Sequence, residues 1–205
     1  MMKTLKKGSR GDDVRILQQT LKLYPDGVFG PLTEETVKEF QRKYGLVADG
    51  IVGPHTWALI QGDPVIKKSK RSINEIIVHC TASYEGNPMT VEQIRKMHKK
   101  ERGWSDIGYH YVVYLNGTIH NGRDVNITGA HCTGHNTHSI GVVYVGGLAK
   151  NGQPKDTRTA AQKEGLLKLL KELKKLYPKA TIHGHRDYAN KACPCFDAKK
   201  EYAGL

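Results

Sequence analysis

Two sets of residues in the first part of the chain repeat at intervals of three and four positions, the spacing of one face of a helix. They are Val14, Leu17, Leu21 and Tyr24, followed by Val37, Phe40, Gln41 and Tyr44. Glu34 and Glu35 would lie in the first turn of the second helix, and Gly45 would end it. The pattern predicts two amphipathic helices.

An internal repeat surrounds the second of these helices. Residues 26–33 (DGVFGPLT) recur twenty-three positions later as residues 49–56 (DGIVGPHT). Each copy is typical of a glycine turn that leads into a helix, which Thr33 or Thr56 would cap or begin. We therefore predict a small three-helix domain over residues 1–62. The Pro-, Ser- and Lys-containing residues 63–72 then indicate a linker.

From residue 73 the pattern changes to alternating strands and helices. We predict strands at 73–79, 109–115, 118–120, 139–145 and 181–183, and helices starting at Thr90 and running over 159–177. Both helices begin with a capping box, and Asn116-Gly117 indicates a two-residue hairpin turn. Residues 139–145 are almost continuously apolar, as in a central strand. The fold class predicted for residues 73–205 is α/β, with a central mixed β-sheet and flanking helices.

The composition of the chain indicates which class of binding partner to expect. The 205 residues carry a formal charge of +12, and the predicted linker holds four basic residues and one acidic one. Such a charge favours an anionic partner, which could be nucleic acid or a bacterial envelope polymer. No Arg-rich helix or Cys/His finger spacing supports nucleic acid. No apolar segment follows Met1, so we expect synthesis in the cytoplasm without a signal peptide.

The segment around residues 183–193 carries candidate chemistry. His183, His185 and Cys193 lie within eleven residues, and imidazole and thiolate are ligands that Zn²⁺ prefers. His79, at the end of the first predicted strand, is the best candidate for a ligand from outside this segment. The residues alone leave two interpretations open, a hydrolytic zinc site or solvated histidines. Cys195 is an alternative ligand, whereas Cys80 and Cys132 are typical of small buried residues.

The first sixty residues resemble a known family. The pattern LKxGxxGxxVxxLQ at residues 5–18, followed by the two DGxxGxxT turns, is similar to the peptidoglycan-binding domain of cell-wall hydrolases. This resemblance implies docking onto the wall polymer without catalysis by the segment itself.

Residues 73 to about 200 resemble zinc-dependent N-acetylmuramoyl-L-alanine amidases of the phage lysozyme-amidase group, which share a fold with peptidoglycan recognition proteins. The matching motifs are IVHC at 77–80, GWxDxGYH at 103–110, NGT at 116–118, GR at 122–123, HxxGxN at 131–136, SIGV at 139–142, GH at 184–185 and KACPxFD at 191–197.

The second resemblance implies roles for individual residues. It assigns the ligands of one Zn²⁺ ion to His79, His185 and Cys193. It assigns catalytic roles to Tyr109 and Lys191. His131 is expected to contact the substrate.

The implied reaction is cleavage of the amide bond between N-acetylmuramic acid and L-alanine by zinc-activated water. The expected partner is bacterial peptidoglycan, with neither nucleic acid binding nor membrane insertion, and the chain is expected to be monomeric. A wall hydrolase without an export signal suggests a phage or prophage endolysin that a holin-type protein releases. The competing hypothesis is a recognition protein that binds peptidoglycan without cleaving it. Cys193 is retained here, which favours the enzyme.

Overall fold

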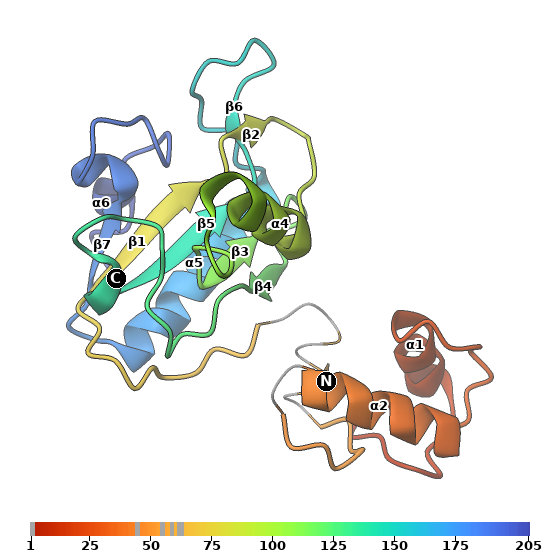
Figure 1. Cartoon of the computed structure of the whole chain (residues 1–205). Helices are drawn as coiled ribbons and strands as arrows, with labels where there is room; N and C mark the ends of the chain where they lie inside the picture. Colours follow the sequence, from red (N-terminus) through yellow and green to blue (C-terminus); the bar gives the residue numbers. More distant parts are fainter. Residues whose placement is uncertain (1–2, 44–45, 54–55, 58–59, 61–63) are drawn as a thin grey trace. The chain divides into compact units, whose positions relative to one another are not determined.

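The computed structural model describes residues 3–43, 46–53, 56–57, 60 and 64–205. The chain divides into two compact units, Met1–Val65 and Ile66–Leu205 (Figure 1). Among the described residues, no helix is both long enough and apolar enough to cross a membrane.

The first unit contains α1 (Asp12–Thr20) and α2 (Pro31–Lys43), which bury the predicted apolar faces around Leu17 and Val37. The prediction for Tyr24 is wrong. The chain leaves the helix at Lys22, whose φ of 59° is not helical, and the side chain of Tyr24 is 86 % exposed. Tyr44 and Gly45 lie outside the described residues, and so does most of the third predicted helix.

A buried glutamine holds each copy of the repeat. Gln18 Nε2 donates to Asp26 Oδ1 at 2.7 Å and to Thr33 Oγ1 at 3.2 Å, while Gln18 Oε1 accepts from the Gly27 N–H at 2.9 Å. Thr33 thus lies within the first turn of α2 and binds Gln18 rather than capping the helix. In the second copy, Gln41 makes the equivalent contacts with Asp49 at 3.0 Å, Thr56 at 3.2 Å and Gly50 at 2.9 Å.

We expect Gln18→Ala to destabilise the first unit by about 1–3 kcal/mol, since it leaves the Gly27 N–H without its acceptor inside the protein. Urea denaturation of the full chain in a Trp104→Phe background, followed by Trp57 fluorescence, measures this loss. Gln19→Ala is the matched control, because Gln19 is the exposed neighbour on the same helix. Equal unfolding midpoints for the two variants would contradict the proposed contribution of Gln18.

The second unit is built on a five-stranded sheet in the order β4-β3-β5-β1-β7. Its strands are β1 (Glu75–Cys80), β3 (Tyr111–Val113), β4 (Ile119–Asn121), β5 (Ser139–Tyr144) and β7 (Thr181–Gly184). Only the β3–β4 pair is antiparallel, so the sheet is mixed. β2 (Ser83–Tyr84) and β6 (Gly147–Leu148) form a separate small pair. The α/β prediction is confirmed, and β5 is the central strand.

Helices cover both faces of the sheet (Figure 1). The leucines of α5 (Ala160–Leu176) pack with Ile76 and Val78 on one face, whereas Ile94 of α4 (Val91–Arg102) packs with Val143 on the other. Both helices begin with the predicted capping boxes. The remaining elements are η1 (Asn136–His138), η2 (His185–Asp187) and α6 (Ala198–Glu201).

The predicted hairpin between β3 and β4 exists, but its turn differs by one residue. The Gly117 N–H donates to the Tyr114 carbonyl at 2.8 Å, so Leu115 and Asn116 occupy the centre of the turn. Gly117 follows with a φ of 80°, as in a three-residue hairpin loop. A Cβ atom at this glycine would lie 2.3 Å from the Ala161 carbonyl oxygen, so the close approach of α5 also requires glycine.

Residues 66–72, which the sequence assigns to the linker, pack against the second unit. Ile66 contacts its core, and the Ser69 N–H donates to Tyr177 Oη at 2.6 Å. The Arg71 guanidinium donates to the carbonyls of Val125 and Ser139, which fixes the start of this unit beside the sheet.

Candidate active site

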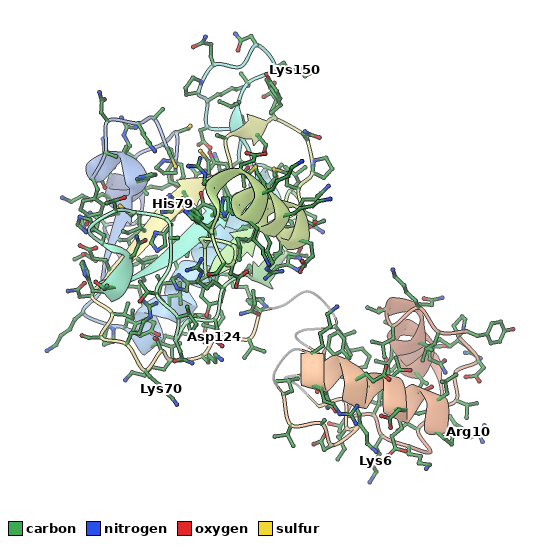
Figure 2. All side chains as sticks on the ribbon, viewed as in Figure 1. Lys6, Arg10, Lys70, His79, Asp124 and Lys150 are labelled. Carbon is green, nitrogen blue, oxygen red and sulfur yellow. The ribbon has the colours of Figure 1, made fainter. Side chains whose placement is uncertain are left out.

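Parallel strands bring two distant histidines together. β1 and β7 pair in register so that Val78 lies opposite Gly184. The next residue in the chain is a histidine in both cases, His79 within β1 and His185 directly after β7, and their ring centroids lie 4.7 Å apart. Figure 2 labels His79 in the interior of the second unit, and its side chain is 1 % exposed.

Cys193 reaches the same point from the loop after η2. The Arg186 N–H donates to the Cys193 carbonyl, and Tyr144 Oη donates to the Pro194 carbonyl, both at 2.7 Å. These contacts hold the loop against the strand ends. Cys193 Sγ lies 3.9 Å from His79 Nδ1 and accepts from the Cys80 N–H at 3.3 Å.

The three residues fit a zinc ion. The ligand atoms of His79, His185 and Cys193 all lie within 4.8 Å of one another. A tetrahedral zinc ion would hold a nitrogen and a sulfur about 3.6 Å apart, close to the distance between Cys193 Sγ and His79 Nδ1. Three protein ligands leave one position open, which is the arrangement of catalytic rather than structural zinc.

The protonation states suit the same ion. Burial holds the pKa of His79 far below its ordinary value, so the imidazole is neutral. Burial also lowers the pKa of His185, and the nearby Lys191 ammonium lowers it further. A hydrogen bond from the Cys80 thiol lowers the pKa of Cys193, which favours the thiolate.

His131 lies directly behind His79. Its Nδ1 is 3.1 Å from His79 Nε2, the nitrogen that does not face Cys193. The imidazole rests on β5 at Gly141, where a Cβ atom would lie 2.5 Å from His131 Cδ2. His131 is expected from the sequence to contact the substrate, and in the structure it also contacts and orients His79. Such contacts fix the tautomer and direction of a ligating imidazole.

We expect His131→Ala to weaken zinc binding by about 10- to 100-fold, the usual effect of losing a residue that orients a metal ligand. Competition with a fluorescent zinc chelator measures the affinity. His120→Ala is the control, since His120 lies on β4 and stacks on Tyr114 instead. Unchanged affinity in the His131 variant would exclude the orienting role.

A cleft of about 380 Å³ opens beside these residues. It is lined by His98, Arg102, Trp104, Tyr109, Ala130, His131, Cys132, Thr133, Asn136, His185 and Lys191. The structure thus brings the two expected catalytic residues, Tyr109 and Lys191, into one cleft with His131 and His185. The Tyr109 ring lies 5.1 Å from that of His79, and burial raises the pKa of Tyr109, so the phenol keeps its proton at neutral pH.

Two lining residues at the end of α4 were not singled out from the sequence. His98 and Arg102 lie four residues apart, so they share one face of the helix. This spacing of four residues could have indicated from the sequence that the two side chains lie together on one face of the helix. His98 Nδ1 accepts from the Gly108 N–H at 3.0 Å, and burial lowers the pKa of His98 to about 4, so this ring is neutral.

Cys195 lies outside the ligand cluster. Its Sγ is 3.9 Å from Cys80 Sγ and donates to the Gly147 carbonyl at 3.2 Å. Among the described residues, the cluster that includes His79 contains one cysteine, Cys193.

Comparison with known proteins gives matches for both units. Residues 69–196 match the family described as N-acetylmuramoyl-L-alanine amidase, and residues 10–60 match a peptidoglycan binding domain family. The chain is 42 % identical over 131 residues to the endolysin of Klebsiella phage KP32, covering 64 % of this chain and 86 % of the relative. It is 41 % identical over 133 residues to the endolysin of Escherichia phage T7, covering 65 % and 87 %.

A solved structure agrees with these matches. The N-acetylmuramoyl-L-alanine amidase LysC from Clostridium intestinale URNW superposes with a TM-score of 0.54 at 30 % identity. The superposition covers 67 % of this chain and 91 % of the amidase.

Proposed function

Because the chain belongs to the N-acetylmuramoyl-L-alanine amidase family, we propose that it cleaves the amide bond between N-acetylmuramic acid and L-alanine in peptidoglycan. We assign peptidoglycan binding to residues 1–62 and catalysis to residues 73–205, with residues 63–72 between them. The observation that carries this proposal is the convergence of His79, His185 and Cys193 beside one cleft.

We assign the metal site to one Zn²⁺ ion held by His79, His185 and Cys193. When bound, zinc supplies Lewis acidity that generates a hydroxide nucleophile near neutral pH. The fit of the donor atoms and their protonation states support this assignment.

The other residues act on charges and protons. Attack on an amide carbonyl develops negative charge on its oxygen, and the Lys191 ammonium lies in the cleft where it can stabilise that charge. Tyr109 Oη remains a phenol, so it can donate a hydrogen bond to the reacting oxygen or pass a proton towards the leaving amine. His131 orients His79 and contributes to the cleft wall that faces the substrate.

The biological setting we propose is host lysis by a phage or prophage endolysin. The similarity to two phage endolysins supports it. The net charge of +12 favours the anionic bacterial envelope as the surface on which the enzyme acts. We propose that the enzyme acts as a monomer, without inserting into a membrane, after a holin-type protein releases it to the wall.

Mass spectrometry of digested sacculi tests the activity. The expected products are stem peptides with a free L-alanine amino group and intact glycan strands, and a chelator should prevent their release. Binding to the wall without any released peptide would instead support the competing hypothesis, a recognition protein that binds peptidoglycan without cleaving it. Cleavage at another bond would overturn the proposed reaction.

A further inference from the structure

A second group of metal-binding side chains lies outside the cleft lining. His135 Nδ1 is 2.9 Å from Glu75 Oε2, and His138 Nε2 is 3.3 Å from the same oxygen. The ligand atoms of Glu75, His135 and His138 all lie within 4.8 Å of one another. Among the described residues, this is the one such cluster besides His79, His185 and Cys193.

The two clusters lie at opposite ends of β1. Glu75 is the first residue of the strand and pairs with Ser139 on β5 and Thr181 on β7. His79 follows four residues later, which separates the two Cα atoms by about 13 Å along a strand. No ligand is shared, so the two groups can bind ions independently.

The spacing of the second cluster suits a transition metal. Ligand atoms bound at about 2.0–2.2 Å lie about 2.8–3.5 Å apart in tetrahedral or octahedral coordination. Both imidazole nitrogens already lie at such distances from Glu75 Oε2. The side chains of Glu75, His135 and His138 are 15 %, 28 % and 33 % exposed, so an ion and its remaining water ligands can enter from solvent.

Neighbouring residues already orient the three ligands. Tyr188 Oη donates to Glu75 Oε1 at 2.9 Å, which leaves Oε2 directed at the histidines. The Tyr188 ring also stacks on His135, with centroids 3.8 Å apart. Thr137 Oγ1 lies 3.3 Å from His138 Nδ1, the nitrogen that faces away from Glu75. Residues that hold the second oxygen or nitrogen of each ligand are typical of metal sites.

We propose that Glu75, His135 and His138 form a second metal site, which binds a divalent ion of the Zn²⁺, Ni²⁺ or Cu²⁺ class. Two imidazoles and one carboxylate suit these borderline ions better than Mg²⁺ or Ca²⁺, which prefer oxygen ligands alone.

The second site lies on the segment that forms one wall of the cleft. His131, Cys132, Thr133 and Asn136 line the cleft, and they belong to the same segment as His135 and His138. The Asn136 side chain ties this segment together by accepting from the His131 and Cys132 N–H groups at 2.8 and 2.9 Å. An ion at the second site therefore fixes one wall of the cleft to the start of β1.

Cobalt titration of the full-length, metal-free protein tests the proposal. The Cys193 site is expected to produce a thiolate-to-cobalt charge-transfer band in the near ultraviolet. A second equivalent of Co²⁺ is expected to add visible ligand-field absorption without a further increase of that band. Zinc analysis after equilibration should give two ions per chain. Saturation at one equivalent in the wild-type protein would overturn the proposal.

Three variants assign the second equivalent. The double variant His135→Gln/His138→Gln should lose it and keep the charge-transfer band, whereas Cys193→Ser should lose the band and keep the second equivalent. Glu75→Gln, which retains the side-chain volume, should weaken the binding of the second Co²⁺ equivalent by at least about tenfold. A second equivalent that persists in both Glu75→Gln and the double variant would contradict the assignment.

The matched control is His183→Gln. His183 lies near the same tyrosine, with ring centroids 5.1 Å apart, but its Nε2 contacts Thr181 Oγ1 at 2.9 Å and it is not a member of the cluster. This variant should bind two equivalents. Loss of the second equivalent in the control would show that the ion binds a different set of histidines. Because the count of ions is independent of wall cleavage, failure of the amidase proposal would leave this test intact.

Discussion

Replacing Cys193 with serine is expected to lower amidase turnover by more than about 10³-fold. The thiolate is the one anionic member of a cluster whose other two ligands are neutral imidazoles. A serine hydroxyl stays protonated at neutral pH, so the variant would offer zinc two imidazoles and a weak neutral oxygen. Release of stem peptides from sacculi measures turnover, and zinc analysis after dialysis measures retention of the tightly bound ion.

Cys195→Ser is the matched control for this experiment. It makes the same chemical change two residues away, on a thiol that contacts Cys80 and the Gly147 carbonyl outside the ligand cluster. This variant should retain zinc and activity close to the wild-type values. Circular dichroism of both variants separates the loss of a ligand from the loss of the fold. Chelator-sensitive activity in Cys193→Ser at the wild-type rate would exclude Cys193 as a ligand.

The parts of the fold that depend on local sequence signals were predictable. Thr90 and Thr159 begin helices because each is followed by a glutamine that completes a capping box, and all the interactions involved lie within four residues. The apolar run at 139–145 forms the central strand because both of its faces are buried. In contrast, Tyr24 matched the helical spacing, but the chain had already left the helix at Lys22.

The turn before β4 illustrates a different limit. Asn-Gly is a strong signal for a two-residue hairpin turn, yet here Gly117 follows the turn. The close approach of α5 at Ala161 accounts for the requirement for glycine at this place. Since α5 begins more than forty residues later in the chain, no local pattern could have indicated it.

The candidate site was predictable in its chemistry and less so in its arrangement. Coordination chemistry makes His79, His185 and Cys193 candidates, and the family resemblance selects them as the ligand set. The meeting of the two histidines, however, depends on the parallel pairing of β1 with β7. The contact of His131 with His79 depends on a loop that packs over Gly141, and no spacing rule describes it. Glu75 is likewise far in sequence from His135 and His138, so no local pattern indicates that they meet.

Replacing Lys191 with methionine is expected to reduce kcat by about 10²- to 10³-fold, the usual effect of losing one group that stabilises an oxyanion. Lys191 lines the cleft with Tyr109 and His185, and its charge matters most when negative charge develops on the substrate carbonyl oxygen. KM should change much less than kcat, because the interaction is made in the transition state rather than with bound substrate. Initial rates on soluble muramyl-peptide fragments separate the two constants.

Two further variants distinguish the charge of Lys191 from a general effect of the surface. Lys191→Arg keeps a cation at this position and should recover part of the lost kcat, while Lys199→Met removes an exposed lysine from α6 and should leave kcat unchanged. Zinc content should be the same in all three variants, since Lys191 is not a member of the ligand cluster. If kcat of Lys191→Met stayed within tenfold of the wild type, the tetrahedral oxyanion would have to be stabilised by the metal and Tyr109 alone. An equal fall in Lys191→Met and Lys199→Met would instead trace the effect to the overall positive charge of the protein, an effect that added salt should screen.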